Sequence, residues 1–162
     1  MRVNQSMLSQ TLLRSTLWMS LGAWVGSWAF FAFVVSRVAF QILPEDLAGN
    51  LAASLLTILH FGGAAAAFVA AGSAAALGRR GWVVVLPLGL ALTCLVSELW
   101  ISPEIAAVRP SAIGEAATLE TDERFHLLHG LSIGLFLVVH FASLILVGLN
   151  ARLDARLSRT NP

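Results

Sequence analysis

Five ionisable side chains interrupt long apolar stretches of this 162-residue sequence, and they are the residues that could do chemistry. They are His60, Glu98, His126, His129 and His140. On membrane-insertion scales, an ionisable group at the centre of a span costs roughly 2.5–3.5 kcal/mol, so such groups are functional candidates by default. We therefore ask first what these five groups could form.

Glu98, His126 and His129 lie near one end of their apolar stretches, and so does Arg37. We expect these four residues to form an outer polar network. One interpretation is a cluster of salt bridges and hydrogen bonds that fixes helix ends. The other is a metal or proton-relay site, because two histidines three residues apart with a nearby carboxylate are suitable ligands for a divalent cation.

His60 and His140 lie deeper and form a predicted inner pair. On an ideal helix, His129 and His140 are about 20° apart around the axis and about 16 Å apart along it, so they share one face. One interpretation of the inner pair is two neutral imidazoles bonded to nearby carbonyls or hydroxyls. The alternative is axial ligation of a b-type haem between facing helices, with His60, His140 and His129 as the candidate haem or metal ligands. We predict no resident cofactor from the leading interpretation.

The elements that position these groups are four apolar runs, at residues 15–36, 51–77, 82–101 and 125–149. Each is long enough to cross a hydrocarbon core about 30 Å thick. The chain is 57% hydrophobic and only 12% charged, about half the charge of a typical soluble domain. We predict a single domain over residues 1–162, an all-α membrane bundle of four helices running up-down-up-down, with a longer outer loop between the third and fourth spans.

The arginines predict the orientation of the four spans. Seven of the ten arginines fall on the side that carries both termini. Because cytoplasmic loops carry the basic excess, we expect an inner-membrane protein with both termini in the cytoplasm. Glu98 is the one acidic residue that falls inside a span.

Small residues recur at four-residue spacing on three of the spans and predict close helix packing. The positions are Gly22 and Gly26 on the first span, Gly62, Ala66, Ala70 and Ala74 on the second, and Gly130 and Gly134 on the fourth. Three such stripes favour a compact bundle, and they are open to two uses, packing within this chain or against a partner.

Several function classes are excluded by composition and motif. A net charge of +1 offers no phosphate-binding surface, so a nucleic-acid partner is excluded. Cys94 is the only cysteine, which rules out a disulfide framework. The glycines lie inside apolar spans rather than at strand-to-helix turns, so no P-loop, dinucleotide fingerprint or hydrolase elbow is present. We predict no catalytic residues.

The segment from Phe125 to Ser132, with its His-Gly-Leu-Ser string, resembles the transmembrane protein 205-like family, a bacterial four-span domain of unknown function. Gly22-Ala23-Trp24, Leu43-Pro44 and Trp100-Ile101-Ser102-Pro103 also resemble that family. The resemblance marks His129, Gly130 and Ser132 as family-typical positions and adds Ser132 to the predicted polar network. Arg37 and Glu98 depart from the family pattern.

The resulting hypothesis is a small polytopic membrane protein without catalytic activity. It would act as a subunit or auxiliary of a membrane complex, or in small-molecule or metal tolerance, with the lipid bilayer and other membrane subunits or a second copy as partners. The alternative hypothesis is a haem- or metal-binding redox protein that uses the intramembrane histidines.

Overall fold

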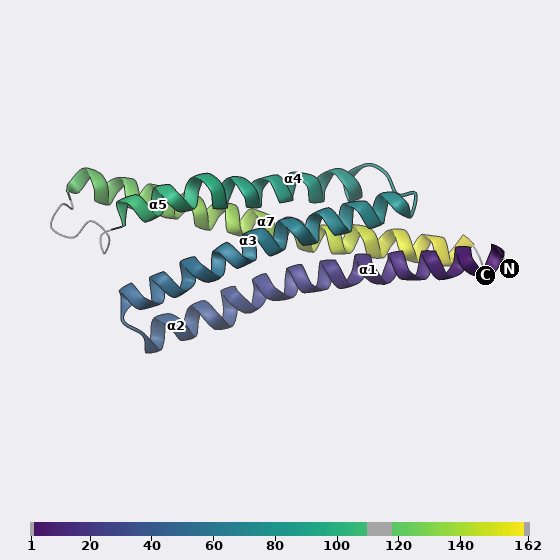
Figure 1. Ribbon diagram of the computed structural model, residues 1–162, viewed down its shortest axis with the longest axis horizontal. Helices are drawn as coiled ribbons and strands as arrows, with labels where there is room; N and C mark the ends of the chain where they lie inside the picture. Colours follow the sequence, from purple (N-terminus) through teal and green to yellow (C-terminus); the bar gives the residue numbers. More distant parts are fainter. Residues whose placement is uncertain (1, 110–117, 161–162) are drawn as a thin grey trace.

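The structure, a computed structural model, describes residues 2–109 and 118–160. Four helical spans in this part of the chain are long and apolar enough to cross a membrane. They run alternately up and down, so that both ends of the chain lie at the same end of the bundle (Figure 1). The predicted all-α four-helix membrane bundle is confirmed.

The spans are longer than the apolar runs alone predicted. The first span combines α1 (Arg2–Phe30), a π-helical segment η1 (Phe31–Val35) and α2 (Ser36–Ile42). The second is α3 (Glu45–Ala76); the third combines α4 (Trp82–Val96), a second π-helical segment η2 (Ser97–Ile101) and α5 (Ser102–Val108); the fourth is α7 (Leu119–Thr160). Helix α5 occupies part of the predicted outer loop, and residues 110–117 of that loop lie outside the described residues.

Local sequence explains where the spans turn. Leu43 is extended, as expected for a residue that precedes proline, and α3 starts just after Pro44 with Glu45 and Asp46 in its first turn. The turn between α3 and α4 carries Gly78 and Gly81 at φ values of 74° and 69°. Glycine adopts this left-handed backbone without the steric cost that a side chain adds.

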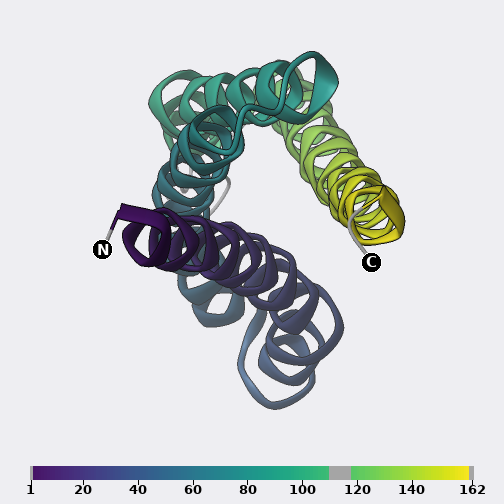
Figure 2. The same ribbon diagram turned by 90° about the vertical axis from the view of Figure 1, so that its right-hand side faces the viewer.

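Helix α3 is the centre of the packing. Figure 2 shows it between α1 and α4, and α7 on the other side of α4. Large side chains at four- and three-residue spacing line one face of α1 and pack against alanines of α3; they are Leu17, Leu21, Trp24 and Trp28 on α1, and Ala64, Ala67, Ala70 and Ala74 on α3. A surface of small residues lets another helix approach closely, which is how helices associate in lipid.

The predicted packing stripes lie mostly outside this core. Gly22, Gly26, Gly62, Gly130 and Gly134 are exposed, and a Cβ at any of them would have no neighbour within 4 Å. On α3, the predicted stripe residue Ala66 is partly buried against the core, and Ala70 and Ala74 of the same stripe are core residues. The bundle uses the opposite face of α1, because its tryptophans and leucines fill the space above the α3 alanines. Within the described residues these glycines therefore do not pack against another helix of the chain, and their use against a partner stays a prediction.

Gly63 is the glycine whose missing side chain matters most. A Cβ there would lie 2.9 Å from Trp24 Nε1 and 3.3 Å from Trp28 Nε1. Both indoles are rigid and fully buried. We expect Gly63→Ala to lower the free energy of unfolding by about 1–3 kcal/mol, the usual cost of overpacking a core.

The adjacent Gly62→Ala is the matched control, since its Cβ would enter open space. It should leave stability unchanged or raise it slightly, because alanine favours helix by about 1 kcal/mol over glycine. Unfolding of both variants in detergent, followed by circular dichroism, compares them. Equal stability of the two variants would show that the indoles do not need the space at Gly63.

Candidate functional site

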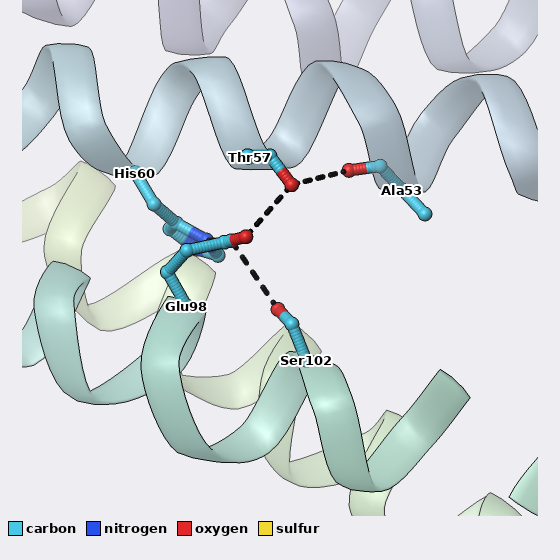
Figure 3. Close-up of polar contacts among 5 residues, drawn as sticks. All are labelled: Ala53, Thr57, His60, Glu98 and Ser102. Carbon is cyan, nitrogen blue, oxygen red and sulfur yellow. Dashed lines mark hydrogen bonds and ion pairs between the residues drawn. The ribbon is translucent and has the colours of Figure 1, made fainter. Parts of the chain in front are cut away.

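The acidic residue inside the membrane, Glu98, sits at the centre of a buried hydrogen-bonded cluster (Figure 3). Its Oε2 lies 2.9 Å from His60 Nδ1, and its Oε1 accepts a hydrogen bond of 2.7 Å from Thr57 Oγ1. Ser102 Oγ, one turn further along the same span, donates to Oε2 at 3.4 Å. The side chains of His60 and Glu98 are 5% and 11% exposed. We call these four residues the Glu98 centre.

The Thr57 hydroxyl has two acceptors within reach. Besides Glu98 Oε1, it lies 3.3 Å from the Ala53 carbonyl oxygen. A hydroxyl carries a single hydrogen and can also accept. Thr57 can therefore donate to an ionised Glu98, or accept from a protonated Glu98 while donating to Ala53.

Two features, a π-helical turn in the third span and the length of the α3–α4 hairpin, bring Glu98 to this position. Glu98 lies in η2, where a π-helical turn changes the face on which the following residues project. Such turns are rare and are frequent at functional sites. In addition, His60 lies 18 residues before Gly78 and Glu98 lies 17 after Gly81, so the α3–α4 hairpin places them opposite each other. The nearly equal spacing of His60 and Glu98 from the glycine turn could have predicted their contact from the sequence. Their estimated depths in the membrane did not predict it.

The other members of the predicted outer network lie elsewhere. Arg37 is exposed on α2, and the contacts of Glu98 come from Thr57, His60 and Ser102 instead. His126 is exposed and lies 3.6 Å from Asp122 on its own helix. His129 is exposed and stacks on Phe125 at a centroid distance of 5.6 Å, whereas Ser132 is half-buried. The structure thus replaces the predicted network by a cluster between α3 and the third span.

The predicted inner pair is linked through two other rings. Trp28 contacts His60 at a centroid distance of 5.9 Å and stacks on Phe136 at 4.6 Å. Phe136 in turn stacks on His140 at 6.5 Å. His140 is buried, and its Nδ1 has no hydrogen-bond partner in the described structure. The contacts between the two imidazoles run through these rings, and haem or metal ligation by His60, His140 and His129 stays a prediction.

No group of three or more His, Cys, Asp or Glu side chains within the described residues is arranged to hold a metal ion. The Glu98 centre contributes one carboxylate, one imidazole and two hydroxyls. A carboxylate and an imidazole both exchange protons readily, so the chemistry that this donor set supports best is proton binding.

A second polar cluster lies at the end of the bundle that carries the termini, and the sequence analysis did not find it. Arg79, in the α3–α4 turn, is buried and donates to Asn150 Oδ1 and Asp154 Oδ1 of α7. Trp18 of α1 donates to Asp154 Oδ2 at 3.0 Å. We call these four residues the Arg79 cluster. Asn150 and Asp154 are four residues apart and share one face of α7, and this polar pair was the signal available in the sequence.

A family model for a domain of unknown function, DUF4149, matches residues 19–113. The chain belongs to this family. The DUF4149 match contains the whole Glu98 centre and Arg79, whereas Asn150 and Asp154 lie beyond it. No curated protein matches the chain, and neither does any solved structure.

The Arg79 cluster provides a test of buried against exposed charge in this DUF4149 protein. Asp154→Asn leaves the buried guanidinium without its counter-charge, so we expect a loss of about 1–3 kcal/mol in unfolding free energy, less than for a fully buried pair because Asp154 is 24% exposed. Denaturant titration in detergent measures the loss.

The matched control is Glu104→Gln, which breaks the pair between Glu104 and Arg124, both about half exposed. Exposed pairs contribute roughly 0–1 kcal/mol, so this variant should stay close to the unaltered protein. A loss for Asp154→Asn no larger than that for Glu104→Gln would contradict a stabilising role for the Arg79 cluster.

Proposed function

We propose that this DUF4149 protein is a non-catalytic accessory protein of the inner membrane that binds and releases a proton at the Glu98 centre. The observation that carries the proposal is the position of the Thr57 hydroxyl between Glu98 Oε1 and the Ala53 carbonyl. This hydroxyl gives the carboxyl group a complete set of partners in both of its protonation states.

In the ionised state, the carboxylate accepts hydrogen bonds from Thr57, His60 and Ser102. In the protonated state, Glu98 Oε1–H donates to Thr57, which donates to Ala53, while Oε2 still accepts from His60. A buried polar group without a partner costs about 1–3 kcal/mol, and neither state leaves one. The exchange of one proton therefore needs only a reversal of the Thr57 hydroxyl.

The neighbouring elements add few competing charges to this centre. The titratable group that faces Glu98 from α3 is His60, and α1 contributes the uncharged ring of Trp28, which contacts His60. In the described contacts, α7 reaches this region through Phe136. The proposed proton site therefore consists of the Glu98 carboxyl group and the His60 imidazole in contact with it.

The accessory role is supported by what surrounds the centre. Glu98 bonds Thr57 and His60 across the contact between α3 and the third span, which suits a group that holds these two spans together. The resemblance of Phe125–Ser132 to transmembrane protein 205-like proteins supports placing the chain in that group. We propose that it serves a larger membrane process, as a subunit of a complex or in small-molecule or metal tolerance.

Infrared difference spectroscopy of the protein in lipid nanodiscs tests proton binding. As pH is lowered, we expect a carbonyl band of a protonated buried carboxyl group that is absent from Glu98→Gln. This variant should also keep its unfolding free energy within about 1 kcal/mol, because its amide can donate to Thr57 as a protonated carboxyl would.

Glu104→Gln, which alters an exposed carboxylate near the same end, should retain the buried band. If Glu98→Gln and the unaltered protein give the same difference spectrum between about pH 4 and pH 9, the range spanning ordinary carboxyl and imidazole titration, proton binding at Glu98 is excluded.

Orientation in the membrane is proposed from the arginine distribution, with both termini in the cytoplasm. Cys94 is buried, so a Cys94→Ala background permits single cysteines at the exposed positions Arg80 and Glu120. In right-side-out vesicles of cytoplasmic membrane, an impermeant maleimide should label Glu120→Cys and spare Arg80→Cys. The reverse pattern would invert the proposed orientation.

A further inference from the structure

The end of the bundle that carries the termini contains an open hollow between α1 and α7. Its volume is about 810 Å³, and its walls include Thr11, Arg14, Ser15, Trp18, Met19 and Asp154. We propose that this hollow binds the phosphate headgroup of an anionic phospholipid from the leaflet on that side, a function separate from the Glu98 centre.

The charge of the hollow favours an anion. Asp154 is held by Arg79 on one carboxylate oxygen and by the Trp18 indole on the other, so its negative charge is offset. Arg14 is exposed on α1 and has no salt bridge to an acid among the residues that the structure describes. Among the described side chains, the hollow therefore carries one positive charge, that of Arg14, without an acidic partner.

The donors available there suit a phosphate group. The Arg14 guanidinium has five N–H donors in a planar fork that matches two phosphate oxygens, and the exposed Ser15 hydroxyl lies next to it. The Thr11 hydroxyl already donates to the Met7 carbonyl at 3.0 Å, which leaves its oxygen as an acceptor and not as a phosphate donor. Arg14 and Ser15 are thus the two recognition residues.

The order of polar and apolar residues along α1 selects a lipid over a soluble phosphate. Thr11, Arg14 and Ser15 occupy the end nearest the terminus, whereas Trp18 and the exposed Met19 lie deeper in the span. These residues cover about 12 Å of helix, more than the roughly 5–8 Å depth of one headgroup region, so they extend from the headgroups to the acyl chains. Tryptophan is enriched at this depth, and basic pockets between helices on the cytoplasmic side bind anionic headgroups.

Native mass spectrometry with added phosphatidylglycerol tests the proposal. The unaltered protein should retain one phosphatidylglycerol more tightly than phosphatidylcholine, which has the same phosphate but no net charge. Arg14→Gln should weaken phosphatidylglycerol binding about tenfold or more, because a hydrogen bond to a charged group contributes roughly 1.5–3 kcal/mol. Ser15→Ala should give a smaller loss of a few fold.

Arg80→Gln is the matched control, since Arg80 is exposed at the same end but does not line the hollow. Its phosphatidylglycerol affinity should equal that of the unaltered protein. Equal affinities for Arg14→Gln and Arg80→Gln would overturn the proposal. So would equal binding of phosphatidylcholine, or displacement of the lipid by an equal concentration of glycerol phosphate, which would identify a soluble phosphate as the ligand.

Discussion

A buried carboxylate inside a membrane protein must find its hydrogen-bond partners within the protein, and this constraint sets the geometry of the bundle. Glu98 meets it through Thr57 and His60 on α3 and Ser102 on its own span. These contacts exist at only one register of the α3–α4 hairpin. A shift by one residue would rotate His60 by about 100° around α3 and leave the carboxylate unsatisfied. The Glu98 centre therefore fixes the register at one end of the hairpin, as the glycine turn does at the other.

The same register brings the core into contact. Gly63 follows His60 by about one turn, and its open face receives the indoles of Trp24 and Trp28 beside Cys94. Trp28 then carries the packing from α3 to α7 through its stacking on Phe136. Helix α1 is thus positioned by the absence of a side chain at Gly63 and not by its own glycines. Polar pairing and close packing act on adjacent turns of α3, so a change in one is expected to reach the other.

Sequence reasoning predicted the four spans and the alternating topology, because apolar length is visible along the chain, and it singled out Glu98 as a lone acid inside a span. It did not predict the partners of Glu98 or the packing faces. Both depend on how each helix is rotated about its own axis. The π-helical turn at Ser97–Ile101 changes this rotation in the third span, and the spacing of residues in the sequence does not reveal such a turn. Gly22 and Gly26 illustrate the difficulty, since GxxxG spacing identifies a smooth face but not its neighbour. Arg79 illustrates a different difficulty. It lies in a turn between spans, and the residues that it bonds when buried, Asn150 and Asp154, are more than seventy positions away in the sequence.

The two polar clusters differ in how far their hydrogen bonds depend on protonation. A guanidinium stays protonated throughout the physiological range, so the contacts of Arg79 with Asn150 and Asp154 do not depend on proton supply. The Glu98 centre pairs a carboxyl with an imidazole, and both groups can exchange protons. A change in proton supply would therefore act on the α3–α4 hairpin at the Glu98 end, while the Arg79 cluster holds the turn against α7 and, through Trp18, against α1. The Arg79 end of the hairpin is thus independent of proton supply, whereas the Glu98 end has hydrogen-bond partners for both protonation states of its carboxyl group, so the hairpin keeps its register in either state.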